Sequence, residues 1–417
     1  MTDAVPALED LFRHEAGKIC AWLVRLLGPG RLELIEDAVQ DAFSAALAQW
    51  RFEGTPQRPA AWLAIAARNK ALDRLRRETR LESLDPNDEA AAWRLGFANP
   101  QETGKPDDTL ALMFVACHPA LSDEEQTMLT LQAVCGFNAR QIARAFLATP
   151  EAVTQRLVRA KRRLRDLKLT VEIPEGTELA GRLAGLLNAI YLLFTGGYTA
   201  AEGERLMAEE RCAEALRLVT ILCEHPGTAT AETHALAALI CLHHARTATR
   251  TGARGDIVLL AEQDRARWDA TLLARGFGHL RRAMAATELT ALHLEAGIAA
   301  VHASAPSFAQ TDWVLITALY DELARLTPSP VVELNRAVAV SMAYGPAAGL
   351  EMTDRLAAQG ALRSYHLLPS VRGDLLARLG RYHEARGEFE RAATLTRNTR
   401  ESRLLLDRAA ACLREEI

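Results

Sequence analysis

Basic residues gather in one stretch of the sequence together with side chains that could read nucleic acid. Between Arg68 and Arg80 six basic residues stand against two acidic ones, with Asn69 among them and Trp62 two turns upstream. Basic side chains neutralise phosphates, an Asn amide pairs with base edges, and an aromatic ring stacks on an unpaired base. The alternative is a solvated helix face with Trp62 in the core, and charge alone does not decide between the two interpretations.

A second basic stretch follows a tight turn. From Glu151 to Lys168 seven basic residues stand against two acidic ones. Asn138 is placed to cap a short helix, and Thr149 followed by Pro150 predicts the start of the next. A helix, a tight turn and a second, basic helix form the helix-turn-helix pattern. In a major groove, four side chains near the start of the second helix would face base edges and phosphates: Thr154, Gln155, Arg156 and Arg159. A basic surface helix without a ligand is the alternative.

Cysteine and histidine residues that stand close in the sequence lack the spacing of a zinc site. Cys223 is followed by His225, and Cys241 by His243 and His244, but neither group matches the zinc-finger pattern. Buried thiols and incidental histidines are therefore the favoured interpretation, and we expect no metal.

No catalytic constellation is evident either. Cys117 and His118 are neighbours, which point apart on a helix, and no third group is visible to orient them. The sequence also has no Gly-rich phosphate-binding loop. We therefore expect neither a cofactor nor enzymatic activity.

Three amphipathic helices must position the first basic stretch. Apolar residues at helical spacing predict helices over 8–27, 31–50 and 60–80, separated by Gly- and Pro-containing turns. The second of these helices is expected to turn one apolar stripe to the core: Leu32, Ile35, Val39, Phe43, Leu47 and Trp50. An acidic and amide face lies largely off that stripe: Glu33, Glu36, Asp37, Gln40 and Asp41. A solvated face is the common interpretation of such a pattern.

The rest of the chain divides into a linker, a second helical unit and a long extension. Pro, Gly and acidic residues dominate 83–108, which we interpret as a linker. A compact unit is predicted over 109–170, where Ser122 to Glu125 form a capping box and Gly136 ends the helix that follows.

From about residue 171 onward the pattern stays helical to the end. One segment near the C-terminus has small and aromatic residues at the contact positions of a tetratricopeptide repeat: Gly373, Gly380, Tyr382, Ala385, Phe389 and Ala392. We therefore predict an all-α protein with three parts, at 1–82, 109–170 and 171–417, the last of them tetratricopeptide-like.

Composition sets limits on compartment and partners. The 417 residues carry a formal net charge of −4, so binding to a polyanion must come from a local patch. The seven cysteines are scattered, which favours reduced thiols over a disulfide framework. The N-terminus lacks the apolar core of a signal peptide, and no run of about 18 apolar residues predicts a membrane span. We expect a cytoplasmic protein.

Two long motifs carry a resemblance to a known family. LELIEDAVQDAFSAALAQW with RPAAWLAIAARNKALDRLRR resembles region 2 of extracytoplasmic-function sigma factors of RNA polymerase. LSDEEQTMLTLQAVCGFNARQIARAFLATPEAVTQRLVRAKRRLR resembles their region 4. Later segments, among them LLNAIYLLFTGGYTA, SPVVELNRAVAV and LLARLGRYHEARGEFERA, are similar to the subgroup with a C-terminal tetratricopeptide-like extension.

The resemblance implies a role for each polar face. Docking on the clamp helices of the largest polymerase subunit falls to Glu36, Asp37, Gln40 and Asp41. Binding and opening of the −10 element falls to Trp62, Asn69, Lys70, Asp73, Arg74 and Arg77. Reading of the −35 element falls to Thr154, Gln155, Arg156, Arg159 and Arg163. Thr154 departs from the family, where a Lys or Arg is common, and its neutral side chain lacks the charge that such a residue brings to a phosphate.

The same resemblance implies partners. Core RNA polymerase, through its clamp helices and flap, and promoter DNA are expected, as is a small protein with an Asp-Gly-Pro-Phe signature that binds the extension. Two alternatives stay open: a helix-turn-helix regulator that does not replace sigma, and an enzyme or scaffold built on residues 171–417. No membrane partner is expected.

Overall fold

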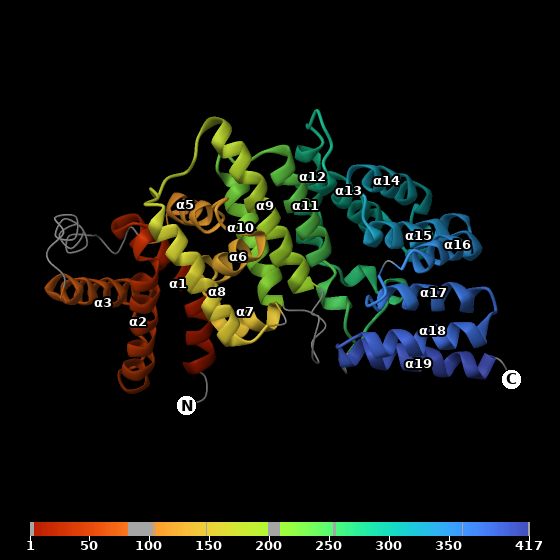
Figure 1. The fold of residues 1–417 in the computed structure, drawn as a ribbon, viewed down its shortest axis with the longest axis horizontal. Coiled ribbons are helices and arrows are strands. Elements are labelled where there is room, and N and C mark those ends of the chain that lie inside the picture. Colours follow the sequence, from red (N-terminus) through yellow and green to blue (C-terminus); the bar gives the residue numbers. More distant parts are fainter. Residues whose placement is uncertain are drawn as a thin grey trace. The chain divides into compact units, whose positions relative to one another are not determined.

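The computed structural model describes residues 4–81, 103, 105–146, 148–198, 209–252, 256–360 and 362–415. The regular structure within these ranges consists of helices joined by turns and loops, with one isolated antiparallel bridge between Thr251 and Ile257 (Figure 1). The prediction of an all-α protein is confirmed. The helices form two compact units, Met1–Leu193 and Phe194–Ile417. Most of the linker at 83–108 lies outside the described residues.

The first unit begins with three long helices and one short turn. These are α1 (Ala4–Leu27), a 3₁₀ turn η1 (Pro29–Arg31), α2 (Leu32–Glu53) and α3 (Pro59–Leu81). Gly28 and Gly54 follow α1 and α2 with φ of 83° and 82°, a conformation that glycine adopts without strain. Ile19, Ile35 and Leu63 are fully buried among the core residues.

One expected core position is wrong. Leu47 of α2 is 49% exposed, whereas Ala46 is fully buried. The helical repeat of 3.6 residues carries the buried stripe from Phe43 through Ala46 to Trp50, which leaves Leu47 at the solvent edge.

The helix-turn-helix prediction agrees with the next elements. They are α5 (Pro106–Ala116), α6 (Asp123–Leu129), a π-helical turn η3 (Thr130–Val134), α7 (Ala139–Ala145) and α8 (Pro150–Asp166). The capping box at Ser122 and the caps at Asn138 and Thr149 are all formed, and Gly136 has a φ of 70°. These local predictions held because each depends on residues only three or four positions apart.

The two parts of the first unit pack directly on one another. α1 contacts both α5 and η3, and Arg25 of α1 pairs with Asp108 of α5 at 2.9 Å. At the closest approach, a Cβ added to Gly17 would lie 1.9 Å from the Val134 carbonyl oxygen. The bulge of the π-helical turn therefore fits against α1 only because residue 17 has no side chain.

α9 (Gly176–Tyr198) runs on into the second unit. Its residues up to Leu193 belong to the first unit, where Arg182 Nη2 donates to the Phe114 carbonyl at 2.6 Å. Residues Gly176–Gly196 are long and apolar enough to cross a membrane, with a mean hydropathy of 1.3, but core helices of globular proteins pass the same test.

Ten further helices follow in the described residues, and consecutive ones pack on each other (Figure 1). They are α10 (Glu209–Glu224), α11 (Ala231–His244), α12 (Ala270–Ala283), α13 (Ala291–Ser304), α14 (Trp313–Leu326), α15 (Pro330–Tyr344), α16 (Pro346–Ala358), α17 (Leu367–Arg378), α18 (Tyr382–Leu395) and α19 (Thr399–Glu415). Short 3₁₀ turns lie at Thr247–Thr249, Leu260–Glu262, Arg265–Arg267 and Phe308–Gln310.

The seam between α17 and α18 has the small-to-aromatic contact that its sequence predicted. A Cβ on Gly373 would lie 2.8 Å from the Phe389 ring, and Ala385, Phe389 and Ala392 are buried. Gly380, in the turn between the helices, has a φ of 77°.

Candidate nucleic-acid interface

α8 buries one face and exposes the other. Val153, Leu157, Ala160 and Leu164 are buried at the spacing of one helix face. The predicted reading residues stand off that face: Thr154, Gln155 and Arg159 are exposed, and Arg156 is partly exposed. Thr154 Oγ1 donates to the Pro150 carbonyl at 2.8 Å, so its hydroxyl proton is already engaged within the helix.

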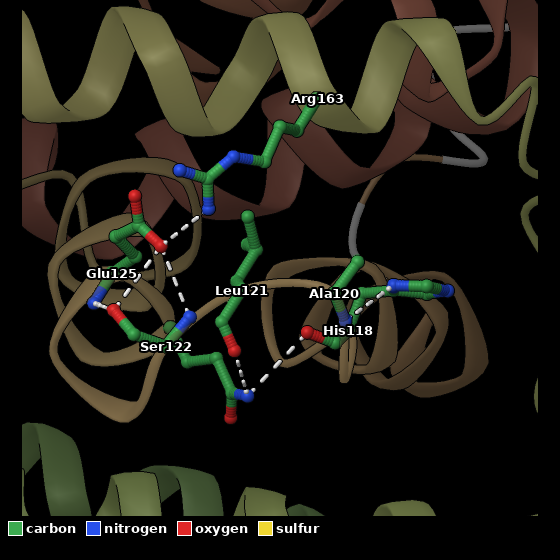
Figure 2. A network of polar contacts seen from close by, with 7 residues as sticks. His118, Ala120, Leu121, Ser122, Glu125 and Arg163 are labelled. Carbon is green, nitrogen blue, oxygen red and sulfur yellow. Dashed lines mark hydrogen bonds and ion pairs between the residues drawn. The ribbon is translucent and has the colours of Figure 1, made fainter.

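Ion pairs to α6 hold α8 in place. Arg156 pairs with Glu124, and Arg163 with Glu125 at 2.9 Å. Figure 2 shows the Glu125 carboxylate accepting from the Ser122 backbone and hydroxyl on one side and from Arg163 on the other. Burial raises the pKa of Glu125, but the hydrogen bonds from Ser122 and the charge of Arg163 outweigh it, so the pKa ends below its ordinary value. Two of the five predicted −35 residues are thus also structural.

The basic face of α3 is largely open. Asn69, Lys70, Asp73 and Arg77 are exposed, and Asn69 Oδ1 accepts from Arg68 at 3.1 Å. The side chain of Arg80 lies outside the described residues.

Trp62, at the other end of α3, is partly buried. Its ring packs edge-on against Trp50 with centroids 5.3 Å apart. Trp62 is therefore compatible with both interpretations of the sequence, as a core residue and as a ring that stacks on an unpaired base. It packs on Trp50 and is only partly buried.

The acidic face of α2 is engaged within the molecule, which the sequence did not predict. Arg74 of α3 donates to both Asp37 and Asp41 at 2.8 Å, so a predicted −10 residue binds two predicted polymerase residues. Glu36 pairs with Lys161 of α8, and the side chains are only 16% and 10% exposed. Gln40 is exposed.

The pair of Glu36 and Lys161 is buried at a seam between α2 and α8. Burial raises the pKa of Glu36, and the Lys161 charge opposes that rise. A cleft of about 610 Å³ runs beside the pair, and Gln40 and Thr154 both line it. In this conformation three of the four predicted polymerase-binding residues line the same cleft as the predicted −35 residue Thr154.

Comparisons with known proteins agree with this layout. Residues 11–81 match Sigma-70 region 2, and residues 111–164 match Sigma-70, region 4. Residues 182–284 match a family of unknown function (DUF6596). A protein of Rhizobium meliloti (strain 1021), "Uncharacterized protein R00370", is 40% identical over 392 residues, which are 91% of each chain. No solved structure matches.

Both regions occur in the expected order, and both fall on the helices that carry the two basic faces. The chain belongs to the sigma-70 factors of RNA polymerase, of the extracytoplasmic-function type, with a C-terminal helical extension.

Proposed function

We propose that this sigma factor binds core polymerase through the acidic face of α2 and places α3 on the −10 element and α8 on the −35 element. The observation that carries the proposal is the pair of basic helix faces exposed on α3 and α8, each supported by a buried apolar face on the other side. Phosphate contacts from such faces position a protein on DNA, and the polar side chains among them supply base readout. The factor acts without catalysis of its own and in the cytoplasm.

Run-off transcription with purified core polymerase and a promoter library tests the proposal. Specific start sites support it, whereas DNA binding without initiation would instead identify a regulator that does not replace sigma. Gln40→Ala should weaken core polymerase binding, because this exposed amide lies between the acidic residues of α2. Gln49→Ala is the matched control, since Gln49 is exposed on the same helix but pairs only with Glu53 at 2.7 Å.

The protein must leave the closed conformation described here before it can bind polymerase. Lys161 covers Glu36, so α8 has to leave α2 before α2 can dock on polymerase. A buried pair loses about 3–5 kcal/mol when one partner is removed without replacement, so a polymerase surface that replaces Lys161 is needed to open the seam. We infer that the closed state is the resting form of the factor.

A disulfide across the seam tests this inference. A Cβ on Gly30 would lie 3.9 Å from the Cα of Arg165, close enough for Gly30→Cys/Arg165→Cys to bridge η1 and α8. The oxidised double variant should lose polymerase binding and regain it on reduction, while each single variant stays insensitive to reductant.

Gly17→Ala should have the opposite effect on polymerase binding. Its Cβ would collide with the Val134 carbonyl and should push the two parts of the first unit apart. Polymerase binding should rise in this variant and stay unchanged in Gly181→Ala, whose Cβ meets nothing within 4 Å. An oxidised lock that binds polymerase as well as the reduced form would refute the closed resting state.

We also propose that the extension is tetratricopeptide-like and regulates the factor. The Gly373–Phe389 seam supports the repeat assignment, and the resemblance alone supports a small Asp-Gly-Pro-Phe protein as partner. Calorimetric titration of that protein into the full chain should give a saturable heat, and its absence would remove the partner from the proposal.

A further inference from the structure

Three side chains from three different helices meet in the second unit. Cys223 lies in the last turn of α10, His234 in the first turn of α11 and His279 in α12. One ligand atom from each residue lies within 4.8 Å of the others. The two histidine Nδ1 atoms are 3.0 Å apart, and Cys223 Sγ is 3.9 Å from His279 Nδ1.

These distances suit a tetrahedral metal centre. Zinc binds His nitrogen at about 2.0–2.1 Å and Cys sulfur at about 2.3 Å, so neighbouring ligand atoms stand roughly 3.3 Å apart for two nitrogens and roughly 3.6 Å for nitrogen and sulfur. The two separations that involve His279 lie within about 0.3 Å of these values, and the ligand atoms of Cys223 and His234 lie within 4.8 Å of one another. Three protein ligands leave a fourth position for water or another ligand.

The protonation states of the imidazoles also suit a metal. Burial lowers the pKa of His234, and Arg282 adds to the effect. Burial, with His234, Arg275 and Arg282, lowers the pKa of His279 to about 4. Both rings are therefore neutral near pH 7, and neutral imidazole is the form that binds metals.

The thiol and the neighbouring charges select the class of metal. Burial raises the pKa of Cys223 to about 12, Cys241 adds to the rise, and Arg275 and Arg282 oppose it. The thiol proton must leave when a metal binds, and it passes to solvent. The two guanidinium groups disfavour a cation but favour a thiolate, so the site suits a thiophilic ion and not a hard one such as Mg²⁺.

We propose that Cys223, His234 and His279 bind one thiophilic divalent ion of the zinc class, which joins α10, α11 and α12. The three residues all fall within residues 182–284, which match a family of unknown function (DUF6596). A bound ion would fix the packing of these three helices. It would join Cys223 to His234, 11 positions later, and His234 to His279, 45 positions later.

The alternative is a metal-free cluster in which one imidazole donates to the other. The 3.0 Å separation of the Nδ1 atoms also fits a neutral hydrogen bond. Titration of the full-length, metal-depleted protein with Co²⁺ separates the two. A bound thiolate gives a charge-transfer band in the near ultraviolet, and tetrahedral Co²⁺ gives intense visible bands, while a hydrogen-bonded cluster gives neither.

We expect one Co²⁺ per chain with a thiolate band, displaced by Zn²⁺ and not by Mg²⁺. Cys223→Ser should abolish the band, and His279→Gln should weaken binding at least tenfold. One control variant should keep it: His225→Gln, whose ring accepts from the Gly227 N–H at 3.2 Å and lies outside the cluster.

A wild-type protein without the band, or a band that persists in Cys223→Ser, would overturn the proposal. Circular dichroism of each variant separates loss of metal from loss of fold, and His279→Gln offers a milder change should Cys223→Ser unfold. Metal content is measured without polymerase, so its outcome is independent of the sigma assignment.

Discussion

At the scale of single residues, α8 divides its polar side chains between holding the fold and meeting DNA. Arg156 and Arg163 are tied to α6, whereas Gln155 is exposed. A side chain that pairs with a base edge contributes about 1–3 kcal/mol of discrimination. Gln155→Ala should therefore relax the preference at one position of the −35 element by that amount, measured by competition binding of the polymerase holoenzyme. Gln359→Ala, an exposed glutamine of the extension, should change nothing.

Glu125 gives a second residue-scale prediction, in pH. Because its pKa is lowered in the fold, its ionised form stabilises the native state above the unfolded pKa of about 4.3, and this stabilisation is lost as pH falls through the folded pKa. Glu125→Gln should destabilise the protein by about 1 kcal/mol at pH 7, the usual contribution of a helix cap. The difference from wild type in urea unfolding should shrink below pH 4. If the difference in the free energy of unfolding stays constant with pH, the loss of stability comes from side-chain packing and not from the charge of Glu125.

Sequence reasoning succeeded at this scale where the cause was local. The caps at Ser122, Asn138 and Thr149 each join residues three positions apart, so a short motif contains the whole interaction. By contrast, His279 lies 56 positions from Cys223, and no short motif signals their contact because only tertiary packing brings that ring to the thiol.

At the scale of helices, amphipathic period predicted the elements but not their partners. The bounds of α2 and α3 agree with the predicted helices within a few residues, yet nothing in either helix signals that Lys161, 125 positions away, covers Glu36. A charged helix face can contact solvent, DNA or another helix. Which of these it contacts depends on the path of the whole chain.

The α17–α18 hairpin offers a test at the same scale. Gly373→Ala would place a methyl group 2.8 Å from the buried Phe389 ring, and overpacking of this kind costs about 1–3 kcal/mol. Gly387→Ala on the exposed face of α18 meets nothing within 4 Å and should stabilise its helix by up to about 1 kcal/mol. Thermal unfolding of the two variants should shift the midpoint in opposite directions. Equal shifts would remove the close small-to-aromatic seam, and with it the main support for a tetratricopeptide-like repeat.

At the scale of the whole molecule, the two compact units of the structure divide after Leu193. The linker composition and the two motifs place the start of the extension near residue 171, within the first of these units. Two polar contacts tie α9 to α5 and α6: Arg182 to the Phe114 carbonyl, and Asn188 to Asp123 at 3.1 Å. The guanidinium of Arg182 also lies 5.6 Å from the centre of the Phe114 ring.

Truncation should therefore depend strongly on where the chain is cut. A fragment ending at residue 198 keeps α9 and should unfold cooperatively, with the far-ultraviolet dichroism of a helical protein. A fragment ending at residue 170 loses the partner of the Phe114 carbonyl and exposes surface that α9 covered. Its thermal unfolding midpoint should therefore fall by several degrees. A loss of about 1 kcal/mol corresponds to roughly 2–4 °C in a domain of this size. Arg182→Ala in the longer fragment should reproduce part of that loss, and Arg355→Ala in the full chain, where Arg355 pairs with Glu351 on an exposed face, should not. Equal unfolding midpoints for the two fragments would show that the first unit is stable without α9, and α9 would then be assigned to the extension.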